Sequence, residues 1–258
     1  MNTIYRKILL NRERKQKMIA VLLDPDKCKG RVLSATVSAL LSNQPDFIFV
    51  GGSHTLMPTE SFIELLKEET KSDVILFPGD ASQFSGNAHA MLYLSLVSGR
   101  NPEFLIGQHI TSSVAIKNSD VEVISTGYVL IDGGKPSSVE YISNTKPIPS
   151  DKKEIALSTA VAAELLGMKL VYLEAGSGAT NPVPAELIEY VSCGLSLPLI
   201  VGGGIRTTED LTAAYEAGAD IVVIGNVLEH DPFKVSELVE CARNFGIGNE
   251  DEYFETYG

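Results

Sequence analysis

Short apolar runs alternate with longer amphipathic segments along most of the chain. The runs are rich in β-branched residues and apolar at consecutive positions, which is typical of parallel strands buried on both faces. We predict eight strands, at residues 18–23, 47–50, 74–77, 91–97, 121–131, 170–173, 197–201 and 221–224. The chain has 258 residues, and a barrel of eight strands and eight helices typically takes about 250.

Helical periodicity occupies most of the gaps between these runs. Apolar residues recur at three- and four-residue spacing, and several segments open with side-chain oxygens that can cap free amides. We predict helices at residues 31–41, 59–69, 101–118, 151–166, 184–192, 207–217 and 232–244. Alternating strands and helices indicate a parallel sheet, so the predicted fold class is α/β, a (β/α)8 TIM barrel.

Some segments depart from this alternation. Residues 78–90 are rich in Gly, Ser and Asn, so we expect an irregular segment to replace the third helix. Residues 133–150 carry three prolines and are predicted to form a long loop over the catalytic face or an oligomer contact. We expect an extra helix at residues 4–13, at the barrel bottom or on its side, and an acidic tail at residues 246–258.

Composition narrows the classes of function. With 33 acidic and 21 basic residues the formal net charge is −12, which disfavours nucleic acid and anionic membrane surfaces as partners. The three cysteines lack the spacing of a disulfide framework or a zinc site, so we expect reduced thiols. Without a signal peptide, a membrane span or a linker, we expect one cytoplasmic domain over residues 1–258, with a helical extension at 1–16.

The glycines after the last two predicted strands carry the strongest chemical signal. Val201-Gly-Gly-Gly-Ile-Arg206 follows the seventh strand, and Gly225-Asn226 follows the eighth. Such glycines let backbone amides approach an anion, and a helix that begins after them directs its positive end toward it. Many barrels bind a phosphate group here. We predict a small phosphorylated substrate, although the glycines could also serve only as tight turns.

A carboxylate and a Gly/Ser loop end the sixth predicted strand. The sequence there is Tyr172-Leu-Glu-Ala-Gly-Ser-Gly178. A carboxylate at this end of a barrel strand can accept a proton from a substrate hydroxyl or stabilise developing positive charge. Tyr172 adds a hydroxyl and a π-face. The alternative for Glu174 is a helix cap or a salt bridge.

A third cluster follows the first two strands. Asp24-Pro25-Asp26-Lys27 ends the first, and Gly51-Gly52-Ser53 ends the second. A carboxylate beside a hydroxyl suits Mg²⁺, which keeps several waters and takes phosphate oxygens as its other ligands. Lys27 could add a positive charge for a phosphate or diphosphate. The alternative for Asp24–Asp26 is a plain turn.

Other polar residues are weaker candidates. The histidines are dispersed and are interpreted as surface residues or supports of a site: His54, His89, His109 and His230. Arg206 is expected either near the phosphate or paired with Asp210 or Glu209 of its own helix. Asp132, after the fifth strand, could contact substrate or form a turn.

These motifs together resemble the geranylgeranylglyceryl phosphate synthases. They occur in that family's order, over roughly residues 15 to 245. The motif around Glu174 is quite specific to the family, whereas the last two glycine motifs are shared by many phosphate-binding barrels. Family members also have an altered third helix, and the long N-terminal lead and residues 133–150 are similar to the larger archaeal and bacterial branch.

The resemblance implies transfer of a prenyl group from an allylic diphosphate, here geranylgeranyl diphosphate, to the 3-hydroxyl of sn-glycerol 1-phosphate. The product would be an ether-lipid precursor. The implied glycerol phosphate site comprises Tyr172, Leu173, Glu174, Ala175, Gly176, Ser177, Gly178, Gly203, Gly204, Gly225 and Asn226. Asp24 and Ser53 would hold Mg²⁺, and Lys27 the diphosphate. Glu174 would deprotonate the hydroxyl, and Tyr172 would flank the allylic carbon.

The prenyl tail needs an apolar groove. The absent third helix would open one among Phe77, Phe84, Tyr93 and Phe104, although these aromatics could also be plain core. The resemblance further implies a homo-oligomer and transient membrane contact for release of the product.

Two other functions are compatible with the residues. A phosphosugar-type barrel isomerase or synthase shares the glycines and would pair Asp132 with Asp24 as acid and base. A non-catalytic barrel that binds a phosphorylated metabolite needs the glycines alone, and then Asp24 and Glu174 have no role.

Overall fold

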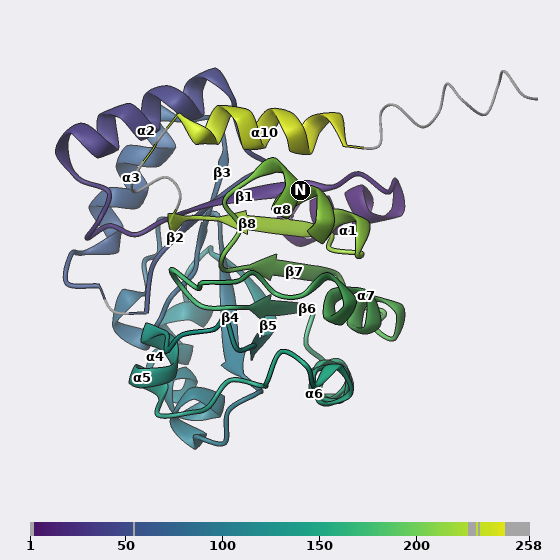
Figure 1. Cartoon of the computed structure of the whole chain (residues 1–258). Coiled ribbons are helices and arrows are strands. Elements are labelled where there is room, and N and C mark those ends of the chain that lie inside the picture. Colours follow the sequence, from purple (N-terminus) through teal and green to yellow (C-terminus); the bar gives the residue numbers. More distant parts are fainter. Residues whose placement is uncertain (1–2, 54, 227–230, 232, 246–258) are drawn as a thin grey trace, which may run out of the picture.

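The structure, a computed structural model, describes residues 3–53, 55–226, 231 and 233–245. Eight parallel strands pair in sequence order, and the last pairs with the first, so the sheet is a closed barrel (Figure 1). The strands are β1 (Met18–Leu23), β2 (Phe47–Val50), β3 (Asp73–Leu76), β4 (Ala90–Leu96), β5 (Glu122–Leu130), β6 (Leu170–Glu174), β7 (Leu199–Gly202) and β8 (Ile221–Ile224). All eight predicted strands, and the predicted fold class, are confirmed.

Helices form an outer layer around the barrel (Figure 1). They are α1 (Ile4–Glu13), α2 (Gly30–Ser42), α3 (Thr59–Glu69), α4 (Gln108–Lys117), α5 (Ser138–Ser143), α6 (Lys153–Leu165), α7 (Ala185–Cys193), α8 (Thr208–Glu216) and α10 (Lys234–Asn244). A 3-10 turn, η1 (Ala81–Gln83), follows β3, and a π-helical turn, η2 (Glu103–Gly107), leads directly into α4. The helix predicted at 101–118 is therefore present, but its first turn is wider than an α-helix.

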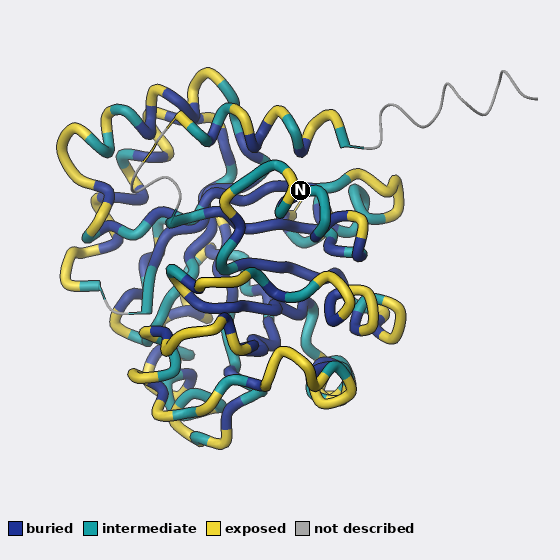
Figure 2. The backbone as a smooth tube through the Cα atoms, viewed as in Figure 1, coloured by how far each residue is buried: buried dark blue, intermediate teal, exposed yellow. Residues whose placement is uncertain are grey.

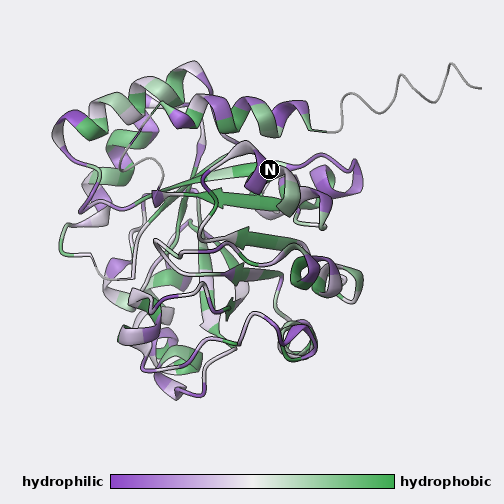
Figure 3. Ribbon diagram, in the orientation of Figure 1, coloured by the Kyte–Doolittle hydropathy of each residue, from purple (hydrophilic) through white to green (hydrophobic). Residues whose placement is uncertain are grey.

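Alternate strand residues serve two separate layers of the core. On β2, Phe47 and Phe49 point into the barrel, whereas Ile48 and Val50 pack against the helices. Figure 2 shows most of the strand residues buried, and Figure 3 shows the strands to be largely hydrophobic where the helices' outer faces are polar. Burial on both faces explains why the sequence runs are apolar without alternation.

The crossover from β3 to β4 has no covering α-helix. Between these strands only η1 is helical, as the composition of residues 78–90 predicts. Asp80 caps η1 by accepting a hydrogen bond from the Ser82 amide. The outer side of β3 is instead packed against α3, and that of β4 against η2.

The prediction that residues 133–150 form only a loop is wrong. They contain α5, whose N-cap Ser137 accepts a hydrogen bond from the Glu140 amide. The helix ends at Asn144, which has a left-handed conformation with φ 49°. Six residues are too few to show a helical period, and the flanking prolines dominate the pattern.

Helix α1 covers the amino ends of the strands, as expected for residues 4–13. The amides of Ile4 and Tyr5 donate to the carboxylate of Glu122 at the start of β5, at 2.6 and 3.2 Å. Lys7 donates to Asp73 at the start of β3, at 2.9 Å. Since this end is closed, the opposite, carboxyl end of the barrel is left for a site.

Three further expectations can be compared with the structure. All three cysteines are free, as predicted: Cys28, Cys193 and Cys241. Among the described helices none is long and apolar enough to cross a membrane. The acidic tail expected at residues 246–258 lies outside the described residues.

Candidate active site

Two adjoining cavities open at the carboxyl ends of the strands. The polar cavity is lined by Asp24, Lys27, Ser53, Tyr172, Glu174, Ser177, Gly203 and Gly225, among others. The apolar cavity is lined by the segment after β3, by side chains of β4 and α4, and by residues of α5. Phe77, Tyr128 and residues of α5 line both cavities, so they form a shared wall.

Glu174 is the buried acid of the polar cavity. It ends β6 with only 6% of its surface exposed, and its Oε1 accepts a hydrogen bond of 2.7 Å from the Gly176 amide. Burial raises the pKa of its carboxyl to about 7, against the opposing effects of the Tyr172 hydroxyl and the Gly176 amide. A carboxyl with this pKa can gain or lose a proton near neutral pH, as a general base must.

Tyr172 stands between Glu174 and the shared wall. Its ring centroid lies 5.4 Å from those of both Phe77 and Tyr128. Burial, followed by the charge of Glu174, raises the pKa of Tyr172 well above its usual value. Its hydroxyl lowers the pKa of Glu174 but makes no well-formed hydrogen bond within the described part of the chain. A buried hydroxyl in this state is available to a ligand.

The glycines of two neighbouring loops adopt left-handed conformations. Gly176 and Gly178 after β6 have φ of 97° and 70°, and Gly203 and Gly204 after β7 have φ of 81° and 77°. A Cβ on Gly203 would lie 2.4 Å from Glu174 Oε1. Gly203 is therefore required for the packing of the cavity wall itself, besides any approach to an anion.

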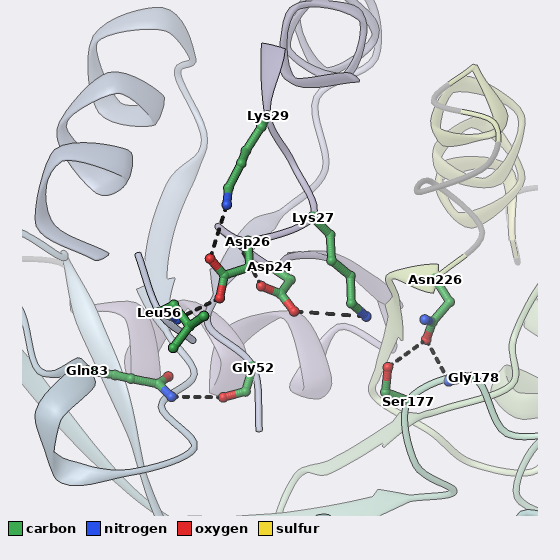
Figure 4. Close-up of polar contacts among 10 residues, drawn as sticks. All are labelled: Asp24, Asp26, Lys27, Lys29, Gly52, Leu56, Gln83, Ser177, Gly178 and Asn226. Carbon is green, nitrogen blue, oxygen red and sulfur yellow. Dashed lines mark hydrogen bonds and ion pairs between the residues drawn. The ribbon is translucent and has the colours of Figure 1, made fainter. Parts of the chain in front are cut away.

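Asn226 joins the end of β8 to the loop after β6. Its Oδ1 accepts hydrogen bonds from the Ser177 hydroxyl at 3.1 Å and the Gly178 amide at 2.8 Å (Figure 4). The structure thus brings together three residues of the predicted glycerol phosphate site. Leu173 differs, because its side chain packs in the outer core layer, so only its backbone can take part in the site.

The remaining predicted glycerol phosphate residues line the loops. Ala175 is buried, and its amide donates to Gly202 O at 3.0 Å. A Cβ on Gly204 would lie 2.7 Å from the Pro182 nitrogen, so Gly204 packs against the end of the loop after β6. At Gly225 a Cβ would meet Leu22 at 3.4 Å, which is tight but tolerable contact. Gly225 therefore has more space around it than Gly203 or Gly204.

Arg206 fastens the loop after β6 to the loop after β7. Its guanidinium donates to the carbonyl oxygens of Ala179 and Thr180. The expected pairing of its side chain with Asp210 is wrong, since Asp210 accepts from the Arg206 backbone amide instead, at 3.0 Å. Sequence spacing gives no signal for this role, because the two loops meet only in the folded barrel.

Asp24 lies on the opposite side of the polar cavity. Its Oδ1 accepts from the Asp26 amide at 2.9 Å, and its Oδ2 lies 3.9 Å from Lys27 Nζ. A Cβ on Gly52 would lie 3.0 Å from Asp24 Oδ2, so the loop that carries Ser53 passes close to the carboxylate. Figure 4 shows the Lys27 side chain extending between Asp24 and the Ser177–Asn226 pair.

The donors around Asp24 fit Mg²⁺ better than zinc. One carboxylate beside a serine hydroxyl suits an ion that keeps waters and takes the rest of its ligands from substrate phosphates. Within the described residues no group of three or more His, Cys, Asp or Glu side chains forms a protein cage, which structural zinc requires. The second acid of the motif is occupied elsewhere, since Asp26 accepts from the Leu56 amide and Lys29 (Figure 4).

Gln83 is a supporting residue that sequence reasoning missed. It is buried on η1, and its Nε2 donates to Gly52 O at 2.9 Å (Figure 4), while its Oε1 accepts from the Gly79 amide at 3.0 Å. Gln83 thus holds the Gly52–Ser53 turn against the segment that replaces the third helix. No periodic pattern marks such a residue within an irregular segment.

The four aromatic residues predicted for a groove all line the apolar cavity. Phe77, Phe84, Tyr93 and Phe104 are half-buried there and are not plain core. The cavity lies where the third helix would cover a regular barrel. It is contiguous with the polar cavity through the shared wall.

The histidines have different environments. His109 is buried and lines the apolar cavity, with its ring edge-on to Tyr93 at 4.4 Å. His109 is therefore not a surface residue, because η2 and α4 turn it inward, and its role as a supporting residue stays a prediction. His89 is exposed and accepts from the Val74 amide. His54 and His230 lie outside the described residues.

Comparison with known proteins identifies the family. The sequence profile of the PcrB family matches residues 11–242. The chain belongs to the PcrB family. It is 48% identical over 243 residues to a geranylgeranylglyceryl phosphate synthase of Chitinophaga pinensis, which covers 93% of this chain and 96% of that protein. A synthase of the same name from Flavobacterium johnsoniae is 45% identical over 234 residues, 90% of this chain and 96% of that protein.

A solved structure of a PcrB relative has the same fold. It is the crystal structure of (S)-3-O-geranylgeranylglyceryl phosphate synthase from Thermoplasma acidophilum in complex with its substrate sn-glycerol-1-phosphate. The TM-score is 0.86 at 32% identity, and the match covers 95% of this chain and 100% of that one. The resemblance inferred from the motifs is thus confirmed.

The structure also bears on the isomerase alternative. Asp132 is exposed, and its Oδ1 accepts a hydrogen bond of 2.9 Å from the Gly134 amide. It is absent from the described lining of the polar cavity. Asp132 therefore stabilises a turn, and the acid–base pair with Asp24 that an isomerase would use is not formed.

Proposed function

We propose that this PcrB protein transfers a geranylgeranyl group from its diphosphate to the 3-hydroxyl of sn-glycerol 1-phosphate. The observation that carries the proposal is the junction of the two cavities. A buried acid with a pKa of about 7, Glu174, lies beside an apolar cavity that is contiguous with its own polar one. An enzyme that joins a polar alcohol to a hydrocarbon needs this pair of compartments.

The acceptor occupies the side of the polar cavity formed by β6, β7 and β8. Its phosphate lies against Ser177, Gly178, Gly203, Gly225 and Asn226, which the folded loops place together. Its 3-hydroxyl points toward Glu174. The Thermoplasma acidophilum relative, solved with sn-glycerol-1-phosphate, supports this acceptor.

The donor spans both cavities. Its hydrocarbon tail lies among Phe84, Tyr93 and Phe104, and its diphosphate lies at Lys27 beside Asp24 and Ser53. Asp24 and Ser53 would hold Mg²⁺, which as a Lewis acid neutralises the charge of the diphosphate.

The reaction forms one bond and breaks another at the first carbon of the prenyl chain. The glycerol oxygen bonds to this carbon, and the carbon–oxygen bond to the diphosphate breaks, with its electron pair leaving on the diphosphate. Glu174 accepts the hydroxyl proton. The Tyr172 ring, between Glu174 and Phe77, flanks the carbon and stabilises its cationic character through its π-face.

The decisive experiment combines purified protein with sn-glycerol 1-phosphate and prenyl diphosphates of several chain lengths, with and without Mg²⁺. We expect Mg²⁺-dependent formation of the prenyl ether of glycerol phosphate, identified by mass spectrometry. The enantiomer sn-glycerol 3-phosphate is the control acceptor. Absence of an ether product with every donor contradicts the proposal and favours a barrel that only binds phosphate.

A further inference from the structure

Tyr128 is a buried tyrosine of β5 that lines both cavities. Among the described residues, the lining that the two cavities share contains only two polar side chains, those of Ser53 and Tyr128. Glu174 and Tyr172, by contrast, line the polar cavity but not the apolar one. Ser53 and Tyr128 therefore mark the junction where one cavity passes into the other.

The hydroxyl of Tyr128 has no hydrogen-bond partner in the part of the chain that the structure describes. Only 6% of the residue is exposed, and the fold holds it by its ring, whose centroid lies 5.4 Å from that of Tyr172 and 6.2 Å from that of Phe77. A buried hydroxyl without a partner opposes folding. Its place at the junction of two cavities indicates that the partner is a ligand.

The surroundings of this hydroxyl keep it protonated. Burial, followed by the charge of Glu174, raises the pKa of Tyr128 well above its usual value. At neutral pH the hydroxyl therefore stays neutral, and it can donate a hydrogen bond without giving up its proton. Such a donor fits an oxygen on which negative charge develops during a reaction.

The order of the strands places Tyr128 on the donor's side of Glu174. Strand β5 pairs with β4, whose side chains line the apolar cavity, and with β6, which ends at Glu174. The donor has its hydrocarbon tail in the apolar cavity and its diphosphate in the polar one, so the bond that breaks between them lies at the junction. The oxygen of this bond then passes between Ser53 and Tyr128.

We propose that Tyr128 donates a hydrogen bond to the oxygen that joins the first prenyl carbon to the diphosphate. When the carbon–oxygen bond breaks, its electron pair stays on this oxygen, and the hydrogen bond strengthens as the oxygen gains negative charge. The proton remains on Tyr128, so Glu174 is still the group that accepts the proton of the acceptor's hydroxyl. This inference rests on the proposed function, because it names the donor's leaving group as the ligand.

The test is Tyr128→Phe, which removes the hydroxyl and keeps the ring that packs against Tyr172 and Phe77. We expect kcat to fall about 10–100-fold with little change in the KM of either substrate, because the hydrogen bond is strongest in the transition state. The melting temperature should stay the same or rise, since no hydrogen bond of the fold is lost. Tyr190→Phe, on α7 and in the lining of neither cavity, is the matched control and should keep the kcat of the parent protein.

A second measurement needs no turnover and separates this inference from the proposed function. Inorganic diphosphate carries the same oxygen as a charged terminal atom, so its Kd with Mg²⁺, measured by calorimetry, should rise about tenfold in Tyr128→Phe. The Kd of sn-glycerol 1-phosphate should stay unchanged, because its phosphate lies at the loops after β6, β7 and β8. If the parent protein makes no ether product, the function fails while the diphosphate Kd still tests Tyr128. An unchanged diphosphate Kd in Tyr128→Phe, or an equal rise in Tyr190→Phe, overturns the inference.

Discussion

The polar and apolar cavities adjoin at Phe77 and Tyr128, yet they are built in different ways. The polar cavity depends on backbone conformation, with left-handed glycines and loops tied by hydrogen bonds to Asn226 and Arg206. The apolar cavity depends on the absence of a helix, and on the half-buried aromatic side chains that remain. A phosphate requires donors at fixed positions, whereas a hydrocarbon requires only dry volume.

This difference predicts how each cavity responds to substitution. In the polar cavity the replacement of a single polar atom can abolish a function, because the donors and acceptors there are held in fixed positions by the folded loops. In the apolar cavity neighbouring side chains share the contact area, so losses should be smaller and graded. The predictions below test this contrast.

The largest effect is expected at Glu174. Glu174→Gln keeps the shape and can still accept the hydrogen bond from the Gly176 amide, but it removes the base. We expect kcat to fall by about 10²–10⁴-fold with little change in substrate affinity. Steady-state kinetics and the melting temperature should be measured on the same preparation.

Glu189→Gln, on the exposed face of α7, is the matched control. If Glu174 only supports the fold, Glu174→Gln should show the reverse pattern, with a lower melting temperature and a near-normal kcat. A stable and fully active Glu174→Gln protein would falsify the assignment of the base.

Asp24 should give the next largest effect. Asp24→Asn is expected to lower turnover about 10²-fold at limiting Mg²⁺, because stabilising the charge of a leaving group is worth several kcal/mol. Phosphate binding should stay near normal, since the glycine loops lie across the cavity. The measurement is a Mg²⁺ titration of activity, alongside the Kd of inorganic phosphate.

Asp26→Asn provides the comparison for Asp24→Asn within one motif. Asp26 holds the Leu56 amide and Lys29, so its loss should loosen the loop without shifting the Mg²⁺ midpoint. If the midpoint of the Mg²⁺ titration shifts equally in both variants, Asp24 is not the metal ligand.

The same contrast explains what the sequence could and could not predict. The strands and the glycine motifs are local, and parallel strands carry their carboxyl ends to one face, so Asp24, Glu174 and Gly203 could be grouped in advance. Gln83 and Arg206 act through contacts between loops that are distant in sequence, and no spacing rule predicts them. Helix α5, with six residues, is too short for its period to be read.

The apolar cavity should respond more weakly. Phe104→Ala removes one half-buried aromatic wall residue, and burial of such a side chain is worth roughly 1.5 kcal/mol or more. We expect the KM for the prenyl diphosphate to rise about tenfold, with the KM for glycerol phosphate unchanged. The KM of Phe104→Leu for the prenyl diphosphate should lie between those of the parent protein and Phe104→Ala. Phe233→Ala, at an exposed position, should leave this KM unchanged. A rise in both KM values would show that the cavities are not separate.

The smallest effect concerns pH. With a pKa of about 7, Glu174 is ionised in about a tenth of molecules at pH 6 and half at pH 7, so turnover should rise about fivefold over that unit. The substrate phosphates also titrate in this range. The pH profile of the residual activity of Glu174→Gln reports the part of the pH dependence that the substrates cause. Dividing the parent profile by that of the variant should leave a single ionisation near pH 7.

Stability should change in the opposite direction over the same range, without any substrate. The pKa of Glu174 is raised on folding from 4.5 to about 7, so between these values the folded state binds more protons than the unfolded one. The contribution of Glu174 to the free energy of unfolding is therefore greatest below about pH 4.5, falls as pH rises to about 7, and is constant above that pH. Urea unfolding at pH 5, 6, 7 and 8 should therefore show the parent protein losing stability relative to Glu174→Gln up to pH 7. A pH-independent difference between the two proteins would mean that Glu174 titrates normally, and the apparent pKa of turnover would then belong to the substrates.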